Sequence, residues 1–168
     1  MLFIVTRITV NSLWQLAVKK RAAVAVRYII LFILIFEEKC MSYKIVEKEE
    51  VATDTFKMVF EAPDIAAAAK AGQFLIVRID ERGERIPLTI GDFSSDENTV
   101  TTVIQALGKS TKKLTKMNVG GSISDIAGPL GTPADVKQLG TVVLVGGGVG
   151  IAPIYPQISA YKNAGNRV

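Results

Sequence analysis

The chain has 168 residues, of which 49% are hydrophobic, and it carries a formal net charge of +4. This length predicts one complete domain or slightly more, and the apolar content is sufficient for a hydrophobic core. The sequence contains no histidine and only one cysteine, Cys40, so a histidine-based triad, a zinc site or a cysteine-ligated cluster cannot be built from this chain.

The net positive charge arises entirely from residues 1–40, which hold six basic and two acidic side chains. Residues 41–168 hold fourteen of each and show no basic stripe. Binding to a phosphate backbone requires such a stripe, so nucleic acid is excluded as a partner.

Residues 1–40 are expected to form an extension distinct from the domain that follows, and three interpretations of it compete. A secretory signal is disfavoured because residues 37–40, Glu-Glu-Lys-Cys, offer no small-residue cleavage site after the apolar run. A membrane anchor needs roughly 20 apolar residues, whereas residues 22–36 are interrupted by Arg27. We prefer the third interpretation, in which translation begins at Met41, and with it a cytoplasmic protein.

Residues 43–126 carry the pattern of short strands and predict an all-β antiparallel six-stranded barrel. An alanine-rich helical turn is expected after residues 62–64, a hairpin tip at 81–84, a polar loop at 92–98 and a linker at 128–133. The six predicted strands cover residues 44–51, 55–61, 74–80, 86–90, 99–107 and 122–126.

The first candidate ligand motif is Arg85-Ile-Pro-Leu-Thr-Ile90. Pro87 lacks an amide hydrogen, which suits a strand whose edge faces a ligand. Arg85 could pair with a phosphate, and Thr89 could offer a hydroxyl to a heterocycle. The simpler alternative is a surface arginine beside an ordinary edge strand.

The second motif is Gly108-Lys109-Ser110-Thr111, at the end of a predicted strand. Ser110 or Thr111 could cap a helix whose positive end would bind a phosphate. A capped helix with a solvated lysine face is the alternative.

The third motif follows an apolar run at residues 141–145 and has glycines at positions 146, 147, 148 and 150. A buried parallel strand that leads through glycines into a helix is how a dinucleotide-binding βα unit opens. The helix is predicted to carry Ile151, Ile154, Tyr155 and Ile158 on one face and to end near Gly165. The alternative is a tight strand-to-helix turn without a ligand.

In this order the three motifs resemble the ferredoxin-NADP reductase superfamily over residues 41–168. The wording of the motifs is similar to one branch, which contains the electron-transfer subunit of dihydroorotate dehydrogenase and the small subunit of NADH-dependent reduced ferredoxin:NADP oxidoreductase. The resemblance implies an FAD-binding barrel at residues 41–137 and, at residues 138–168, the first βα unit of an α/β nucleotide-binding domain that is truncated at its C-terminus. Residues 140–168 should then be loosely packed unless another chain completes the sheet.

The resemblance also implies roles for named residues. Arg85 would bind the FAD pyrophosphate, and Thr89 would lie near N5 and O4 of the flavin. The implied cofactor-binding set is Arg85, Pro87, Leu88, Thr89, Ile90, Gln105, Gly108, Lys109, Ser110, Thr111, Gly146, Gly147, Gly148, Gly150, Ile151, Ala152 and Pro153. Pro87 and Leu88 stand where plant-type reductases have an aromatic residue, so aliphatic groups would cover the flavin.

The function implied is that of an electron-transfer flavoprotein subunit, which passes reducing equivalents between NAD(H) or NADP(H) and a partner redox protein through FAD. The partner would be a large redox subunit of the glutamate synthase-like or dihydroorotate dehydrogenase type, or ferredoxin. The two-iron, two-sulfur cluster of the full-length family has no ligands here, and the acidic residue that selects NAD would fall beyond Val168. The alternative is a flavin- or nucleotide-binding module without turnover.

Overall fold

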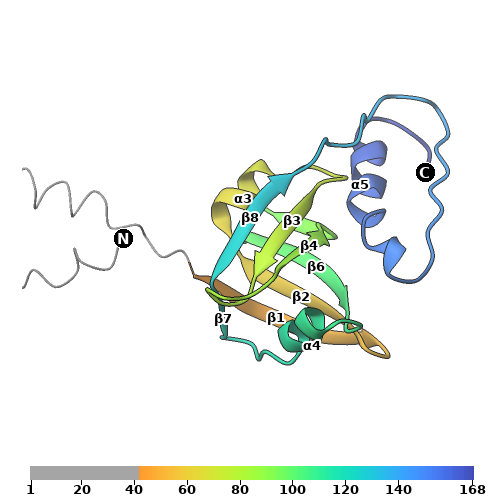
Figure 1. The fold of residues 1–168 in the computed structure, drawn as a ribbon. Helices are drawn as coiled ribbons and strands as arrows, with labels where there is room; N and C mark the ends of the chain where they lie inside the picture. The colour runs from red at the N-terminus through yellow and green to blue at the C-terminus, as the bar shows by residue number, and fades with distance from the viewer. Residues whose placement is uncertain (1–41) are drawn as a thin grey trace, which may run out of the picture. The chain divides into compact units, whose positions relative to one another are not determined.

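The computed structural model describes residues 42–168 (Figure 1), so the interpretations of residues 1–40 lie outside the described part of the chain. Within residues 42–168, no helix is long and apolar enough to cross a membrane. The described elements are β1 (Tyr43–Ala52), β2 (Thr55–Glu61), α3 (Pro63–Ala68), β3 (Phe74–Arg78), β4 (Arg85–Thr89), β5 (Asp92–Ser94), β6 (Thr99–Gln105), α4 (Lys109–Thr115), β7 (Ser122–Ile123), β8 (Asp125–Leu130), the 3₁₀ turn η2 (Gly148–Ile151) and α5 (Tyr155–Asn163).

The strands form two antiparallel sheets. The larger has the order β5-β6-β2-β1-β7 and the smaller has the order β4-β3-β8. β6 illustrates the pattern of these strands: its residues alternate regularly between buried and partly exposed positions. Such alternation places one face of the sheet on a core and the other towards solvent.

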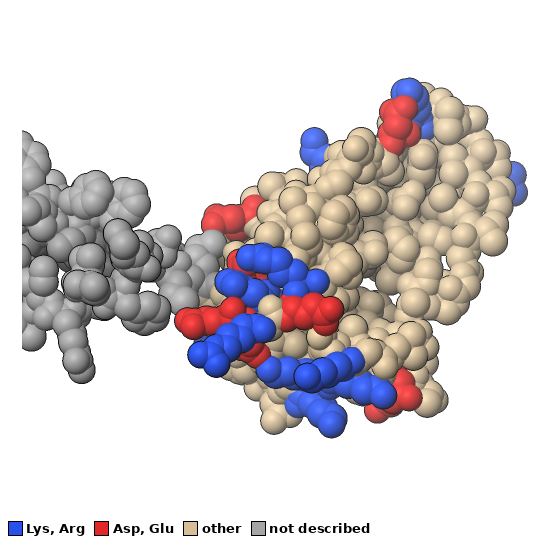
Figure 2. All heavy atoms as spheres, viewed as in Figure 1, with Lys and Arg blue, Asp and Glu red and all other residues tan. Residues whose placement is uncertain are grey.

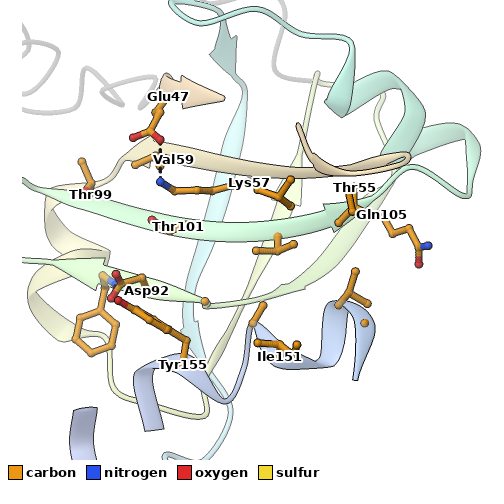
Figure 3. Close-up of a pocket in the computed structure, with 18 of the residues that line it drawn as sticks. Glu47, Thr55, Lys57, Val59, Asp92, Thr99, Thr101, Gln105, Ile151 and Tyr155 are labelled. Atoms are coloured by element: carbon orange, nitrogen blue, oxygen red, sulfur yellow. Dashed lines mark hydrogen bonds and ion pairs between the residues drawn. The ribbon is translucent and has the colours of Figure 1, made fainter. Parts of the chain in front are cut away.

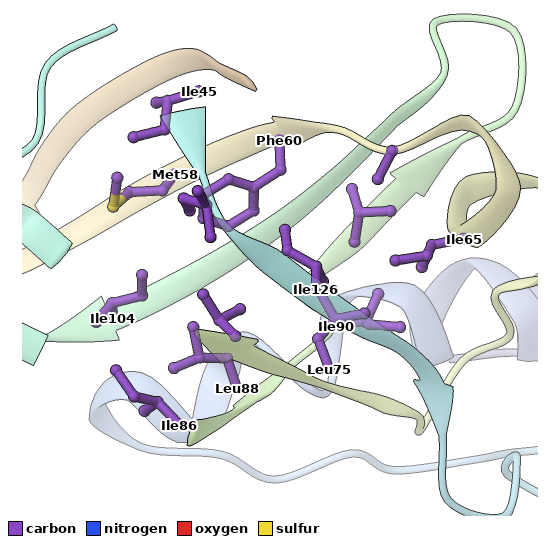
Figure 4. Packing of buried hydrophobic residues seen from close by; sticks show 14 of the residues in the cluster. Ile45, Met58, Phe60, Ile65, Leu75, Ile86, Leu88, Ile90, Ile104 and Ile126 are labelled. Atoms are coloured by element: carbon purple, nitrogen blue, oxygen red, sulfur yellow. The ribbon is translucent and has the colours of Figure 1, made fainter. Parts of the chain in front are cut away.

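The hydrophobic core lies between the inner faces of the two sheets (Figure 4). Met58 and Phe60 of β2 are fully buried, as is Leu75 of β3. Ile65 of α3 and Leu114 of α4 complete the same cluster. The two short helices therefore cover the core where the sheets do not, and this anchors α4 beside the end of β6.

Two local predictions about this region are wrong in part, although residues 95–98 form a turn and residues 131–133 lie outside the strands as predicted. Residues 92–94 form the short strand β5 against β6, where a polar loop was predicted. Residues 128–130, predicted as a linker, continue β8, and Leu130 pairs with Phe74 of β3. At residues 128–130, sheet pairing therefore overrides the local preference of glycine and proline for turns. Residues 42–168 thus form eight strands in two sheets, where six strands in one barrel were predicted.

The predicted strand at 141–145 is not formed in the described structure. Thr141 makes one isolated parallel bridge to Arg167, and the side chains of Val143 and Val145 are 80% and 87% exposed. A parallel strand needs a neighbour along its length and cover on both faces, and residues 42–168 supply neither for this run. The helix does form, but as η2 followed by α5, and its exit at Gly165 has a φ of 82°.

Candidate functional site

Strand β4 presents the first motif at a sheet edge. The side chains of Arg85 and Pro87 are exposed, that of Thr89 is partly exposed, and those of Leu88 and Ile90 are buried in the core. The alternation of a strand accounts for this division. Leu88 and Ile90 can therefore offer a ligand only their backbone, which narrows the side-chain set predicted from the sequence.

The backbone of β4 alternates in the same way. The amide of Ile90 donates to the carbonyl of Gln73, at 3.1 Å. Pairs of residues in antiparallel strands are alternately hydrogen-bonded and not, and Ile90 belongs to a hydrogen-bonded pair. The backbone N–H and C=O groups at positions 85, 87 and 89 therefore point away from β3. Pro87, which has no amide hydrogen, thus occupies a position where β3 requires none.

Arg85 shares a carboxylate with a second arginine. Its Nη1 lies 3.1 Å from Oδ2 of Asp125, and Nη2 of Arg78 lies 3.6 Å from the same oxygen. Arg78 pairs in register with Arg85 on one side and with Asp125 on the other. Two guanidinium groups therefore face one carboxylate on the outer face of the smaller sheet, which leaves a net positive charge there.

Helix α4 is tied to the hairpin between β3 and β4. Ser110 Oγ donates to Glu84 Oε2, next to Arg85, and Lys113 Nζ pairs with Asp80 Oδ2. Figure 2 shows lysine and arginine gathered with acidic side chains over this hairpin and helix. The structure thus brings the first two motifs together, as separate stretches of sequence that meet through Glu84.

The start of α4 differs in detail from the prediction. Gly108 is the N-cap residue, so neither Ser110 nor Thr111 occupies that position. Thr111 Oγ1 instead accepts from the amide of Gly108 at 3.0 Å and lies 3.1 Å from its carbonyl oxygen. Ser110 is left as the side chain of this turn that faces the hairpin.

A cleft of about 1030 Å³ separates the outer face of the larger sheet from the glycine motif (Figure 3). Gln105 of β6 and Thr101 line the wall formed by the sheet, and Lys57 pairs there with Glu47 at 2.7 Å. Ile151 and Tyr155 approach from the opposite wall. Of the predicted site residues, the cleft is lined by Gln105, Gly147, Gly148, Ile151 and Ala152.

The glycine motif has one tight contact and an otherwise open course. A Cβ atom added at Gly146 would lie 2.4 Å from Cδ1 of Ile154, whereas one at Gly147, Gly148 or Gly150 would meet no atom within 4 Å. Gly148 has a φ of 55°, which favours glycine. The open course at positions 147–150 leaves the backbone approachable from the cleft.

Arg85, Ser110 and Gln105 are thus distributed over two neighbouring places, since the first two do not line the cleft. Gly91, two residues beyond the end of β4, lines the cleft, whereas Arg85 lies at the first position of that strand. Arg78, Asp125 and Glu84 were missed by the sequence reasoning. A register assignment that paired Arg78 with both Arg85 and Asp125 would have found the first two.

Two ionisable groups at the site have shifted pKa values. The hydrogen bond from Lys113 lowers the pKa of Asp80, and the charge of Lys113 and the amide of Arg82 act in the same direction. The hydrogen bond to Glu47 raises the pKa of Lys57, against a smaller opposing effect of burial. Both shifts stabilise the charged forms near neutral pH.

Comparison with known proteins gives relatives for this arrangement, although no protein-family model matches the chain. Over 125 residues the chain is 42% identical to the dihydroorotate dehydrogenase B (NAD(+)) electron transfer subunit homolog of Thermotoga maritima, which covers 74% of this chain and 44% of that protein. It is 38% identical over 117 residues to the dihydroorotate dehydrogenase B (NAD(+)) electron transfer subunit of Shouchella clausii, with 66% and 45% covered. The chain is a homologue of these electron transfer subunits. It spans less than half of their length.

Solved structures agree with this relationship. The NADH-dependent reduced ferredoxin-NADP oxidoreductase structure superposes with a TM-score of 0.72 at 43% identity, over 73% of this chain and 45% of that one. Phthalate dioxygenase reductase superposes with a TM-score of 0.62 at 22% identity, over 78% of this chain and 42% of that one. The second likeness concerns the fold alone. The resemblance to ferredoxin reductase-like proteins predicted from the motifs is confirmed.

Proposed function

We propose that this homologue of the electron transfer subunits binds FAD at β4 and α4 and passes reducing equivalents between a nicotinamide nucleotide and a partner redox protein. The observation that carries the proposal is the hydrogen bond from Ser110 to Glu84, which brings α4 beside the residue that precedes Arg85. The relatives add support, because their names describe NAD(+)-linked electron transfer subunits.

The residues at this place fit a dinucleotide with a diphosphate. Arg85 is exposed and can form paired hydrogen bonds to phosphate oxygens. The hydroxyl of Ser110, which donates to Glu84 in this structure, would turn from that carboxylate to a phosphate oxygen. The open edge of β4 offers backbone groups at Thr89 to a flavin ring. Lys109 and Thr111 complete the proposed phosphate contacts.

The proposal assigns the nicotinamide nucleotide to the cleft between the larger sheet and the glycine motif. Gly147, Gly148 and Gly150 would allow the backbone to approach phosphate, and Gln105 faces them from β6. Bound FAD would supply hydride acceptance and single-electron release, and this chain would position the two cofactors. The proposal includes a large redox subunit or ferredoxin as partner and a cytoplasmic location, and it involves no iron–sulfur cluster bound by this chain.

A module that binds flavin without turnover is the second candidate function, and a specific observation favours it. Within the described residues, the glycine motif and the residues after it form only η2 and α5, and the run before the motif forms no strand. Backbone approach to a nicotinamide nucleotide would then rest on a segment with little support.

Titration of the purified 168-residue chain with FAD, followed by anaerobic addition of NADH or NADPH, tests the proposal. We expect FAD to bind and its visible absorbance to bleach on reduction. Bound flavin that stays oxidised would support the module instead, and failure to bind FAD would contradict both candidates.

Two arginines of the same hairpin provide a matched comparison. Arg85→Gln should weaken FAD binding about 10- to 100-fold, because it removes charge-assisted hydrogen bonds. Arg82→Gln is the control, since Arg82 is exposed on the same hairpin and forms no ion pair with the described residues. Equal losses in the two variants would indicate a general effect of charge and would remove Arg85 from the proposed site.

A further inference from the structure

Arg85, Arg78 and Asp125 form a row across three adjacent strands of the smaller sheet. Arg78 stands directly opposite Arg85 on one side and directly opposite Asp125 on the other. Residues directly opposite in antiparallel strands share a face, so the three side chains lie together on its outer face. Like charges in such a pair repel, and here Asp125 offsets the repulsion.

The contacts within the row are unequal. Asp125 Oδ2 lies 3.1 Å from Arg85 but 3.6 Å from Arg78, so its better hydrogen bond is to the arginine proposed to bind the diphosphate. The side chain of Arg85 is 55% exposed, whereas that of Arg78 is 29% exposed. Nε of Arg78 is buried and has no hydrogen-bond partner within residues 42–168. Nη1 of Arg78 donates to the carbonyl of Glu81 at 3.5 Å, and its Nη2 makes only the longer contact with Asp125, so the pairing of Arg78 with this carboxylate can still tighten.

We propose that Asp125 competes with the ligand diphosphate for Arg85, and that Arg78 is the positioning residue that holds Asp125 when the diphosphate takes its place. This inference rests on the proposed function, because it assumes that Arg85 is the diphosphate ligand. Without Arg78, an incoming diphosphate would leave Asp125 as an unpaired carboxylate beside it. With Arg78, the exchange leaves each negative group paired with one guanidinium.

The exchange gives each member of the row a different effect on affinity. Removing the charge of Asp125 removes the competitor and should tighten binding. Removing Arg78 leaves Asp125 entirely to Arg85 and should weaken binding. In a chain that already lacks the Asp125 charge, removing Arg78 should have a much smaller effect, because no carboxylate remains to be held.

The test is a double-mutant cycle on the 168-residue chain, with dissociation constants measured for FAD and for inorganic pyrophosphate. Because exposed ion pairs are weak, we expect Asp125→Asn to tighten FAD binding about two- to fivefold and Arg78→Gln to weaken it by a similar factor. The double variant should bind nearly as tightly as Asp125→Asn alone. Riboflavin, which has no phosphate, serves as the control ligand and should bind all four chains alike.

Three results would overturn the inference. Asp125→Asn could bind FAD no more tightly than the unmodified chain, Arg78→Gln could weaken binding equally in both backgrounds, or riboflavin affinity could follow FAD affinity. The first result would show that Asp125 does not compete with the diphosphate. The second would show that Arg78 acts on the ligand directly through its charge, and the third that the substitutions change the structure of the site. The proposed function would survive each of them if FAD still binds the unmodified chain and binds more weakly to Arg85→Gln.

The pyrophosphate measurement tests the inference even if the proposed function is wrong. If FAD does not bind the unmodified chain, the proposed function fails. The order of pyrophosphate affinities among the four chains then decides the inference alone. The same order as expected for FAD supports the exchange, and equal affinities contradict it.

Discussion

Thr102 and Thr115 are two buried threonines with different hydrogen bonding. Thr102 is fully buried in β6, and its Oγ1 has no partner within the described residues. Thr115 Oγ1 donates to the carbonyl of Thr111 at 3.0 Å. The same replacement by valine, which keeps the shape and removes the hydroxyl, should therefore act in opposite directions at the two positions.

We expect Thr102→Val to raise the free energy of unfolding by about 1–3 kcal/mol, since a buried hydroxyl without a partner is costly. Thr115→Val should lower it by about 1 kcal/mol, since a satisfied hydrogen bond is lost. Urea unfolding of the two variants at neutral pH measures both. A loss of stability in Thr102→Val would indicate that the hydroxyl has a partner in solution.

Gly128 allows a second comparison at the scale of single residues. A Cβ atom at this position would lie 2.5 Å from Cδ2 of Leu75, whose side chain is fully buried. Gly128→Ala should thus lower the free energy of unfolding by about 1–3 kcal/mol through overpacking. Gly147→Ala is the matched control, because a Cβ atom there meets nothing within 4 Å. Equal urea midpoints for the two variants would contradict the packing argument.

The first motif shows what sequence can predict about single residues. The proline at position 87 indicated a strand edge, and β4 is an edge strand on which the side chains of Arg85 and Pro87 are exposed. Leu88 and Ile90 were also predicted to bind the cofactor, but the two-residue period of the strand buries their side chains in the core. Asp125 could not be assigned to Arg85, because that contact depends on a register between strands far apart in sequence.

The tether between α4 and the β3–β4 hairpin makes a prediction at the scale of elements. Lys113 lowers the pKa of Asp80 below its ordinary value of 3.8, so the folded protein favours the ionised carboxylate. The stabilisation is therefore complete well above pH 3.8 and is lost as the pH falls through the lower folded-state value. It should be small, because both side chains are exposed to solvent.

Asp80→Asn should slightly lower the stability of the protein at pH 7 and should have no effect at a pH below the folded-state pKa. Urea midpoints of the two proteins, measured from pH 7 downwards, should converge as the carboxylate is protonated. Asp96→Asn is a control, since Asp96 is exposed and forms no ion pair with the described residues. A difference that persists unchanged at acid pH would exclude the ion pair as its cause.

Elements with a strong local pattern were predicted well, and those that depend on a neighbour were not. β2 was predicted with the bounds it has, because its apolar residues form a near-continuous run. β8 was taken for a linker at Gly128, since glycine and proline usually mark turns. Its residues are held in extended form by pairing with β3, which lies more than forty positions earlier in the chain.

At the scale of residues 42–168, the C-terminal segment contrasts with the two sheets. Residues 138–168 contain only two charged side chains, Lys162 and Arg167. Figure 2 shows the corresponding scarcity of charge on the visible surface of this segment. Val143 and Val145 are largely exposed, in line with the expectation that this region packs loosely. The sequence pattern predicted a buried strand, but burial depends on neighbours that the pattern cannot supply.

Asn166 holds this segment together. Its side-chain oxygen accepts from the amides of Leu139 and Gly140, at 2.5 and 3.0 Å, and its Nδ2 donates to the carbonyls of Lys137 and Tyr161, at 2.8 and 3.0 Å. All the hydrogen-bonding capacity of a buried amide is thus used to join the end of the chain to residues 137–140 and to α5. None of these hydrogen bonds involves a residue of the core between the sheets.

Asn166→Ala should therefore loosen the segment without loosening the core. The loss of buried partners corresponds to about 1–3 kcal/mol, or roughly 10- to 100-fold faster hydrogen exchange at the amides of Leu139, Gly140 and Arg167. The amides of Met58 and Phe60 in β2 should exchange at unchanged rates, because they open only with the sheets. Hydrogen exchange followed by NMR in both proteins measures this. Parallel acceleration in β2 would show instead that the segment and the sheets unfold as one cooperative unit.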